Sequence, residues 1–113
     1  MKGQRLPRVN QLIKKELGEI MLREIDFPEG TLVTLTRVET AANLIEAKVY
    51  VSIMPEEKAP DVLATLKKLI YFVQQKLNKR LRMRPVPRII FVEEKAVREA
   101  GKIEELLEEI HKK

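Results

Sequence analysis

Cysteine is absent from the 113-residue sequence, which excludes disulfides and thiolate metal sites and is compatible with a reducing cytoplasm. Tryptophan is also absent and aromatic residues make up only 4%, so a core has to be built from Leu, Ile and Val. No stretch approaches the ~20 apolar residues that span a bilayer, and no apolar run follows the basic N-terminus as in a signal peptide. These absences predict a soluble protein, and a length of 113 residues is most simply that of one domain.

Side chains suited to catalysis are scarce as well. The only histidine, His111, lies close to the C-terminus, and the only serine, Ser52, has no histidine near it in sequence. The four glycines stand apart from one another, so the sequence contains no phosphate-binding loop. Glutamate pairs such as Glu104-Glu105 lack His or Cys companions and match no calcium-loop pattern. The sequence therefore predicts no enzyme activity, no cofactor and no metal site.

Positive charge is concentrated in one segment. The net charge is +5, yet the stretch from Val62 to Val92 contains no acidic residue, and residues 76–91 read KLNKRLRMRPVPRIIF. Cations near a helix C-terminus interact favourably with the helix dipole, but two or three would suffice for that purpose. The excess is typical of a surface that binds a polyanion. The candidate phosphate-binding residues of this segment are Lys76, Lys79, Arg80, Arg82, Arg84 and Arg88.

A second group of cations lies near the N-terminus and consists of Arg5, Arg8, Lys14 and Lys15. Lys14 and Lys15 fall off the hydrophobic stripe of their predicted helix and are expected to be exposed. Alone they would form an ordinary polar helix face. They would join the binding surface only if the fold sets them beside the basic segment.

Hydrophobic periodicity predicts a first helix over about residues 8–25, with Pro7 at its start. Residues 31–39 and 44–53 are predicted strands, joined by a turn at 41–43 into an antiparallel hairpin. Clean alternation in the second strand places Tyr50 on the outward face. The inward-facing residues would be Ile45, Ala47, Val49, Val51 and Ile53.

A second helix is predicted from Pro60 to a left-handed cap at Asn78. Two following prolines forbid further helix, and residues 88–92 form a short buried strand. From about Ala96 the tail has the pattern of an acidic amphipathic helix. Between helix and strand, Leu81, Met83 and Val86 would turn inward while Arg82, Arg84 and Arg88 project on one side.

The order helix, strand, strand, helix, strand predicts an α+β fold in which two long helices cover one face of a three-stranded sheet. Residues 1–93 would form this domain and residues 94–113 an appended tail helix. Binding through the basic surface should weaken steeply with salt. Because exposed aromatics are scarce, we expect backbone and shape recognition of structured RNA, with only Tyr50 and Tyr71 able to stack on a base.

Several motifs resemble the bacterial ribosome-binding factor A family. Residues 8–17 (RVNQLIKKEL) are similar to the family's opening helix, and residues 33–39 (VTLTRVE) and 47–52 (AKVYVS) to its paired strands. Residues 79–84 (KRLRMR) and 86–91 (VPRIIF) resemble its basic segment and last strand. The tail segment GKIEELL at residues 101–107 fits as well.

The resemblance implies a KH-like fold of the second type. It also implies a cytoplasmic, non-enzymatic assembly factor that binds 16S rRNA on free 30S ribosomal subunits. Such a factor supports late subunit maturation and processing of the precursor rRNA end, and matters most in the cold. We expect a monomer, with neither DNA nor a membrane as partner.

One departure from the family concerns the second helix. The family carries A-x-G at a kink, whereas this sequence has Leu69-Ile70-Tyr71 there. Without the glycine we expect one continuous helix, with the Tyr71 ring packed against the protein.

Other functions remain open from the residues alone. The chain could be a KH-like module for a different RNA, or a protein-interaction module whose acidic tail helix docks on a basic partner. Attachment to a membrane surface is disfavoured because the basic segment contains two prolines and lacks a large apolar face. In an autoinhibited version, the acidic tail would fold over residues 76–88 until RNA displaces it.

Overall fold

The structure is a computed structural model that describes residues 2–94, with side chains from Arg5 onward. The predicted order of elements is confirmed for this part of the chain, and the fold is α+β. The predicted tail helix, the autoinhibitory contact and the domain boundary at residue 93 involve positions outside the described residues. The elements are α1 (Lys2–Glu24), β1 (Leu32–Thr40), β2 (Glu46–Met54), the 3-10 helix η1 (Glu56–Lys58), α2 (Ala59–Arg80) and β3 (Arg88–Glu93).

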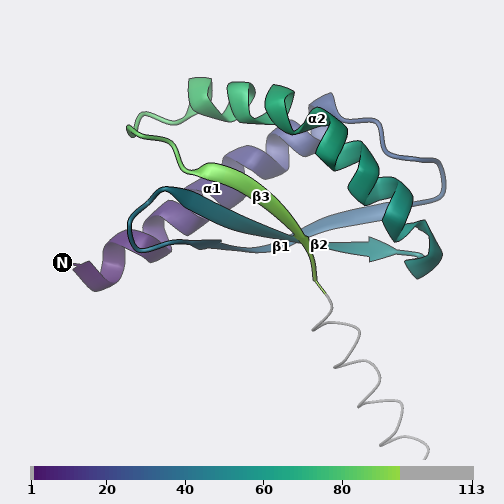
Figure 1. Ribbon diagram of the computed structural model, residues 1–113, viewed down its shortest axis with the longest axis horizontal. Coiled ribbons are helices and arrows are strands. Elements are labelled where there is room, and N and C mark those ends of the chain that lie inside the picture. Colours follow the sequence, from purple (N-terminus) through teal and green to yellow (C-terminus); the bar gives the residue numbers. More distant parts are fainter. Residues whose placement is uncertain (1, 95–113) are drawn as a thin grey trace, which may run out of the picture.

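The three strands form one sheet in the order β1-β2-β3, with β2 in the centre. β1 pairs with β2 in antiparallel fashion and β3 pairs with β2 in parallel, so that Val49 lies between Val38 and Phe91. The register shifts between Leu35 and Arg37, which leaves Thr36 in a bulge. Both long helices cover the same face of the sheet, as predicted (Figure 1).

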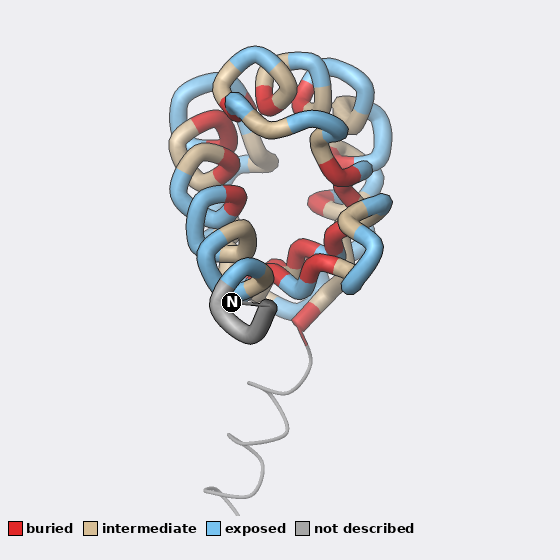
Figure 2. Tube along the Cα trace, turned by 90° about the vertical axis from the view of Figure 1, so that its left-hand side faces the viewer, coloured by how far each residue is buried: buried red, intermediate tan, exposed pale blue. Residues whose placement is uncertain are grey.

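The core lies between that face and the helices, and the buried positions lie along the inner side of the surrounding elements (Figure 2). It is aliphatic, as the shortage of aromatics predicts, because the helical stripes and the alternating strand residues meet there. Ile45 is an exception: it precedes β2 and is 61% exposed, because the pairing that would turn it inward begins at Glu46. Fully buried residues include Ile13, Leu17, Ile20, Val49, Val51, Ile53, Val62, Leu66, Val73, Leu77 and Ile89.

Two element ends differ from the sequence prediction. α1 begins at Lys2, upstream of Pro7, so the proline lies inside the helix. The predicted left-handed cap at Asn78 is wrong, since α2 continues to Arg80 and ends at Leu81 in extended conformation. The physical reason is that Leu77 and Leu81 are both buried, which holds the last turn against the core, and the Leu81 N–H still donates to the Leu77 carbonyl (3.0 Å). α2 runs without interruption past Tyr71, as expected from the missing glycine.

Candidate nucleic-acid interface

The segment between α2 and β3, residues 81–87, is called the exit segment here. Leu81 and Pro87 are buried at its two ends, and Met83 and Val86 pack against the core. Arg82 and Arg84 between them are exposed, so the predicted alternation of inward apolar and outward basic residues is confirmed. The apolar side chains of the exit segment thus pack against the core, and its guanidinium groups lie at the surface.

Gln74 on α2 fixes the point where the exit segment enters β3. Its amide nitrogen donates to the Pro87 carbonyl (3.1 Å), and its amide oxygen accepts the Ile89 N–H (2.8 Å). The Arg88 N–H donates to the Ile45 carbonyl (2.9 Å), which joins the end of the segment to the β1–β2 turn. No sequence motif points to Gln74, because its partners lie in a part of the chain that only the fold brings near.

Arg84 shapes the exit segment with its own side chain. One terminal nitrogen of its guanidinium donates to the carbonyls of Leu81 (2.9 Å) and Met83 (2.6 Å). These bonds satisfy backbone acceptors of an irregular segment and leave the positive charge at the surface.

Three of the six candidate cations form ion pairs within the protein and are not free to bind phosphates. Arg80 donates to the carboxylates of Glu16 and Glu19 on α1 at 3.1 Å each. The hydrogen bond to Glu16, followed by that to Glu19, raises the pKa of the Arg80 guanidinium. The other two pairs are Lys76 with Glu24 (4.0 Å) and Arg88 with Glu46 (3.3 Å). These contacts neutralise charge locally, and Arg80 and Lys76 also join α2 to α1.

The cations left for an external partner are Lys79, Arg82 and Arg84, called the exit cations here. All three are exposed, and none forms an ion pair within the described residues. They occupy the last turn of α2 and the anchored segment behind it. The arrangement offers three positive groups on a fixed backbone, which suits the phosphates of a nucleic acid.

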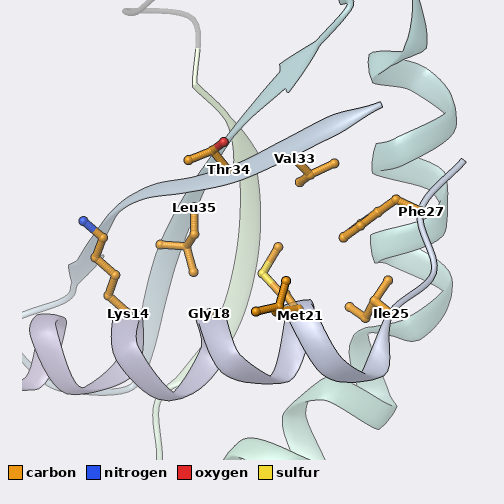
Figure 3. A pocket seen from close by; sticks show the side chains of 9 residues that line it. Lys14, Gly18, Met21, Ile25, Phe27, Val33, Thr34 and Leu35 are labelled. Atoms are coloured by element: carbon orange, nitrogen blue, oxygen red, sulfur yellow. The ribbon is translucent and has the colours of Figure 1, made fainter. Parts of the chain in front are cut away.

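The N-terminal cations Arg5, Arg8, Lys14 and Lys15 are all exposed along α1, and the described side chains provide no ion-pair partner for them. Lys14 borders an apolar groove of about 490 Å³ between α1 and β1 (Figure 3), on the β1 side of the helix. Glu16 and Glu19 instead face α2. Lys14 is therefore separated from the exit cations, whereas Lys15 lies one helical turn from Glu19.

The N-terminal half of α1 and the exit segment lie at the same end of the molecule (Figures 1 and 2). Asn10 fixes this half of α1 to the sheet, because its side-chain oxygen accepts the Thr40 N–H (2.9 Å). Arg5 and Arg8 thus belong to the same end as the exit cations.

The sheet face away from the helices carries a polar cluster that sequence reasoning missed. Tyr50 faces outward as predicted, but the Arg37 guanidinium carbon lies 3.8 Å from its ring centroid. The Tyr50 hydroxyl donates to Glu39 (3.1 Å), and Arg37 Nε donates to the buried Glu94 carboxylate (2.8 Å). The bond to Glu94 is the main cause that raises the pKa of Arg37. Tyr50 is therefore engaged within the protein.

Within residues 2–94, no three His, Cys, Asp or Glu side chains gather in a way that could hold a metal ion. In the same part of the chain, no helix combines the length and apolar character needed to cross a membrane.

Comparisons with known proteins agree on one family. Residues 5–107 match the family described as ribosome-binding factor A. The chain is 35% identical over 112 residues to the ribosome-binding factor A of Natranaerobius thermophilus, which covers 98% of this chain and 86% of that protein.

Solved structures extend the likeness to the fold. The crystal structure of ribosome-binding factor A from Thermus thermophilus aligns with a TM-score of 0.65 and 24% identity, over 82% of this chain and 94% of that one. Coordinates of the T. thermophilus factor fitted into a cryo-electron microscopy map of a 30S complex align with a TM-score of 0.63 and 28% identity. This alignment covers 76% of this chain and 91% of the T. thermophilus chain. The chain belongs to the ribosome-binding factor A family.

Proposed function

We propose that this chain is a ribosome-binding factor that binds the free 30S subunit by contacting 16S rRNA with the exit cations. The observation that supports this most is the set Lys79, Arg82 and Arg84: three exposed cations with no carboxylate partner in the described structure, in a family whose T. thermophilus member was fitted into a 30S complex. Ribosomal RNA would supply the negative charge that this part of the protein lacks.

The physical basis is electrostatic. Each phosphate that a lysine or arginine neutralises releases condensed counterions, so affinity depends steeply on salt. The buried Leu81 and Pro87 hold the exit segment in place, which lowers the entropy lost when its side chains bind. Arg5, Arg8 and Lys15 would extend the contact along the same end of the molecule, with Lys14 at its border.

The proposal includes the finer features that the family resemblance implies. The fold would be KH-like of the second type, with an uninterrupted α2 in place of the kinked helix pair. The protein would act as a cytoplasmic monomer, by binding and not by catalysis. Its role would be late maturation of the 30S subunit and processing of the precursor rRNA end, with the greatest need in the cold.

Co-sedimentation with purified 30S subunits, whole ribosomes and an unrelated structured RNA tests the proposal. The decisive variant carries Lys79→Gln, Arg82→Gln and Arg84→Gln. A matched control carries Arg23→Gln, Lys48→Gln and Lys58→Gln, three cations on other surfaces, so that both proteins lose the same charge from a net +5. We expect the parent and the control to pellet preferentially with free 30S subunits and the first variant to remain in solution.

Two results would contradict the proposal. Equal binding to every RNA would leave only a generic basic RNA-binding module. Equal loss in both variants would mean that overall charge, and not the exit segment, drives association.

A further inference from the structure

The two tyrosines of the sequence differ in their contacts and in their exposure to solvent. The Tyr50 ring lies under the Arg37 guanidinium and its hydroxyl is bonded to Glu39. The Tyr71 side chain is 74% exposed at the middle of α2, and within the described structure no cation–π contact or hydrogen bond involves it. The prediction that Tyr71 packs against the protein is wrong. Of the two tyrosines, Tyr71 is the one with a free aromatic face.

Two lysines lie beside Tyr71 on the helix surface. Residues three and four positions apart are neighbours on a helix, which places Lys67 and Lys68 one turn before Tyr71 and Gln75 one turn after it. Both lysines are exposed and form no ion pair with any described side chain. We call Lys67, Lys68, Tyr71, Phe72 and Gln75 the α2 patch.

Phe72 adds a second aromatic ring to the α2 patch. It is 38% exposed, and the Lys76 ammonium lies 5.4 Å from its ring centroid. The acidic residue of α2 is Asp61 in its first turn, and the sequence from Val62 to Val92 contains none. No carboxylate of α2 beside the patch would therefore repel a polyanion. Exposed aromatic faces bordered by unpaired lysines are the combination with which proteins hold unpaired bases and their phosphates.

We propose that Tyr71 stacks on an unpaired base of RNA while Lys67 and Lys68 neutralise the adjacent phosphates. This inference rests on the proposed function, because it takes RNA as the partner, and it adds a second contact of a different kind. The exit cations bind backbone phosphates, whereas the α2 patch binds a base that has left its helix. RNA recognition by backbone and shape alone, as expected from the sequence, would then be incomplete.

Intrinsic fluorescence can report on Tyr71 directly. The protein has no tryptophan and two tyrosines, so Tyr50→Phe leaves Tyr71 as the only tyrosine. The substitution keeps the ring beneath Arg37 and removes only the hydroxyl. In this background, titration with a single-stranded RNA of about 12 nucleotides should quench the emission, because a stacked base quenches tyrosine. A fully paired RNA hairpin of equal charge should quench much less.

Affinity measurements separate stacking from charge. Tyr71→Ala should weaken binding to the single-stranded RNA and to 30S subunits by about 5- to 160-fold, with an unchanged dependence on salt. Tyr71→Phe keeps the ring and should bind like the parent. Joint replacement of Lys67 and Lys68 by Gln should lower the slope of log affinity against log salt by about 1.4 for a single strand.

The outcomes are distinct from those of the proposed function. If the parent pellets with 30S subunits but Tyr71 shows neither quenching nor a loss on replacement by Ala, stacking is overturned and the proposed function stands. If Tyr71→Ala loses 30S subunits yet binds RNA normally, the α2 patch contacts protein, which also overturns stacking. Quenching by single strands together with failure of 30S binding would retain stacking and reject the ribosomal role.

Discussion

Arg80 and the exit cations should respond differently to the loss of charge. Arg80 forms ion pairs with Glu16 and Glu19, whereas Lys79, Arg82 and Arg84 are exposed without an ion pair in the described structure. Replacing the three exit cations by Gln should therefore change how binding to 16S rRNA depends on salt. Arg80→Gln should leave that dependence unchanged and lower the midpoint of thermal unfolding, because it leaves two carboxylates of α1 without their partner.

The size of the effect follows from counterion release. Each neutralised phosphate contributes about 0.7 for a single strand to about 0.9 for a duplex to the slope of log affinity against log salt. Losing three contacts should therefore flatten the slope by about 2.1 to 2.7. Between about 50 and about 200 mM salt, the parent should lose roughly 20- to 40-fold more affinity than the triple variant.

Filter binding or fluorescence anisotropy with 16S rRNA fragments over this salt range provides the slopes, and circular dichroism provides the unfolding midpoints. An unchanged slope in the triple variant would show that the phosphate contacts lie elsewhere. A slope flattened by Arg80→Gln alone would show that the ion pairs with α1 open on binding.

The remaining predictions concern stability. Gly18→Ala should raise the free energy of unfolding by about 0.4 to 1 kcal/mol, because a Cβ there meets nothing within 4 Å and mid-helix glycine is unfavourable. Urea denaturation followed by circular dichroism measures this free energy. A decrease would mean that the groove beside Gly18 is tighter than described. Burial, and then the hydrogen bond to Glu39, raises the pKa of Tyr50 above its ordinary value of 10.0. A folded-state pKa above the unfolded one gives stability that is complete below about pH 10 and is lost as the pH rises through the folded value. Urea unfolding between about pH 9 and about pH 11 should therefore show a smaller loss in Tyr50→Phe than in the parent.

Most of the fold could be predicted from the sequence because burial follows simple periods. The stripe in α1 and the alternation in β2 each mark one buried face. The errors lie at the ends of the helices and strands. Ile45 continues the alternation of β2 but precedes its first paired residue, and Asn78 suits a cap but lies between two buried leucines that keep the helix going.

The candidate cations could be listed from the sequence, but which of them form ion pairs within the protein could not. Arg80 meets Glu16 across a separation of 64 residues, and Arg37 meets Glu94 across 57. No local pattern contains such pairs. The same limit applied to the tyrosines, since the cation over Tyr50 comes from the neighbouring strand β1 and the exposure of Tyr71 depends on which side of α2 faces the core.

The paired and the free arginines have complementary roles at the end of α2. The slope of affinity against salt counts phosphate contacts, whereas the affinity at a fixed salt concentration also depends on how well the binding groups are held in place. Arg80 ties the last turn of α2 to α1, between Lys79 and the exit segment. Replacing Arg80 should therefore lower the affinity by the same factor at every salt concentration and leave the slope of log affinity against log salt unchanged. Replacing the exit cations should change that slope. A uniform loss of affinity in Arg80→Gln would identify Arg80 as the residue that positions the free cations.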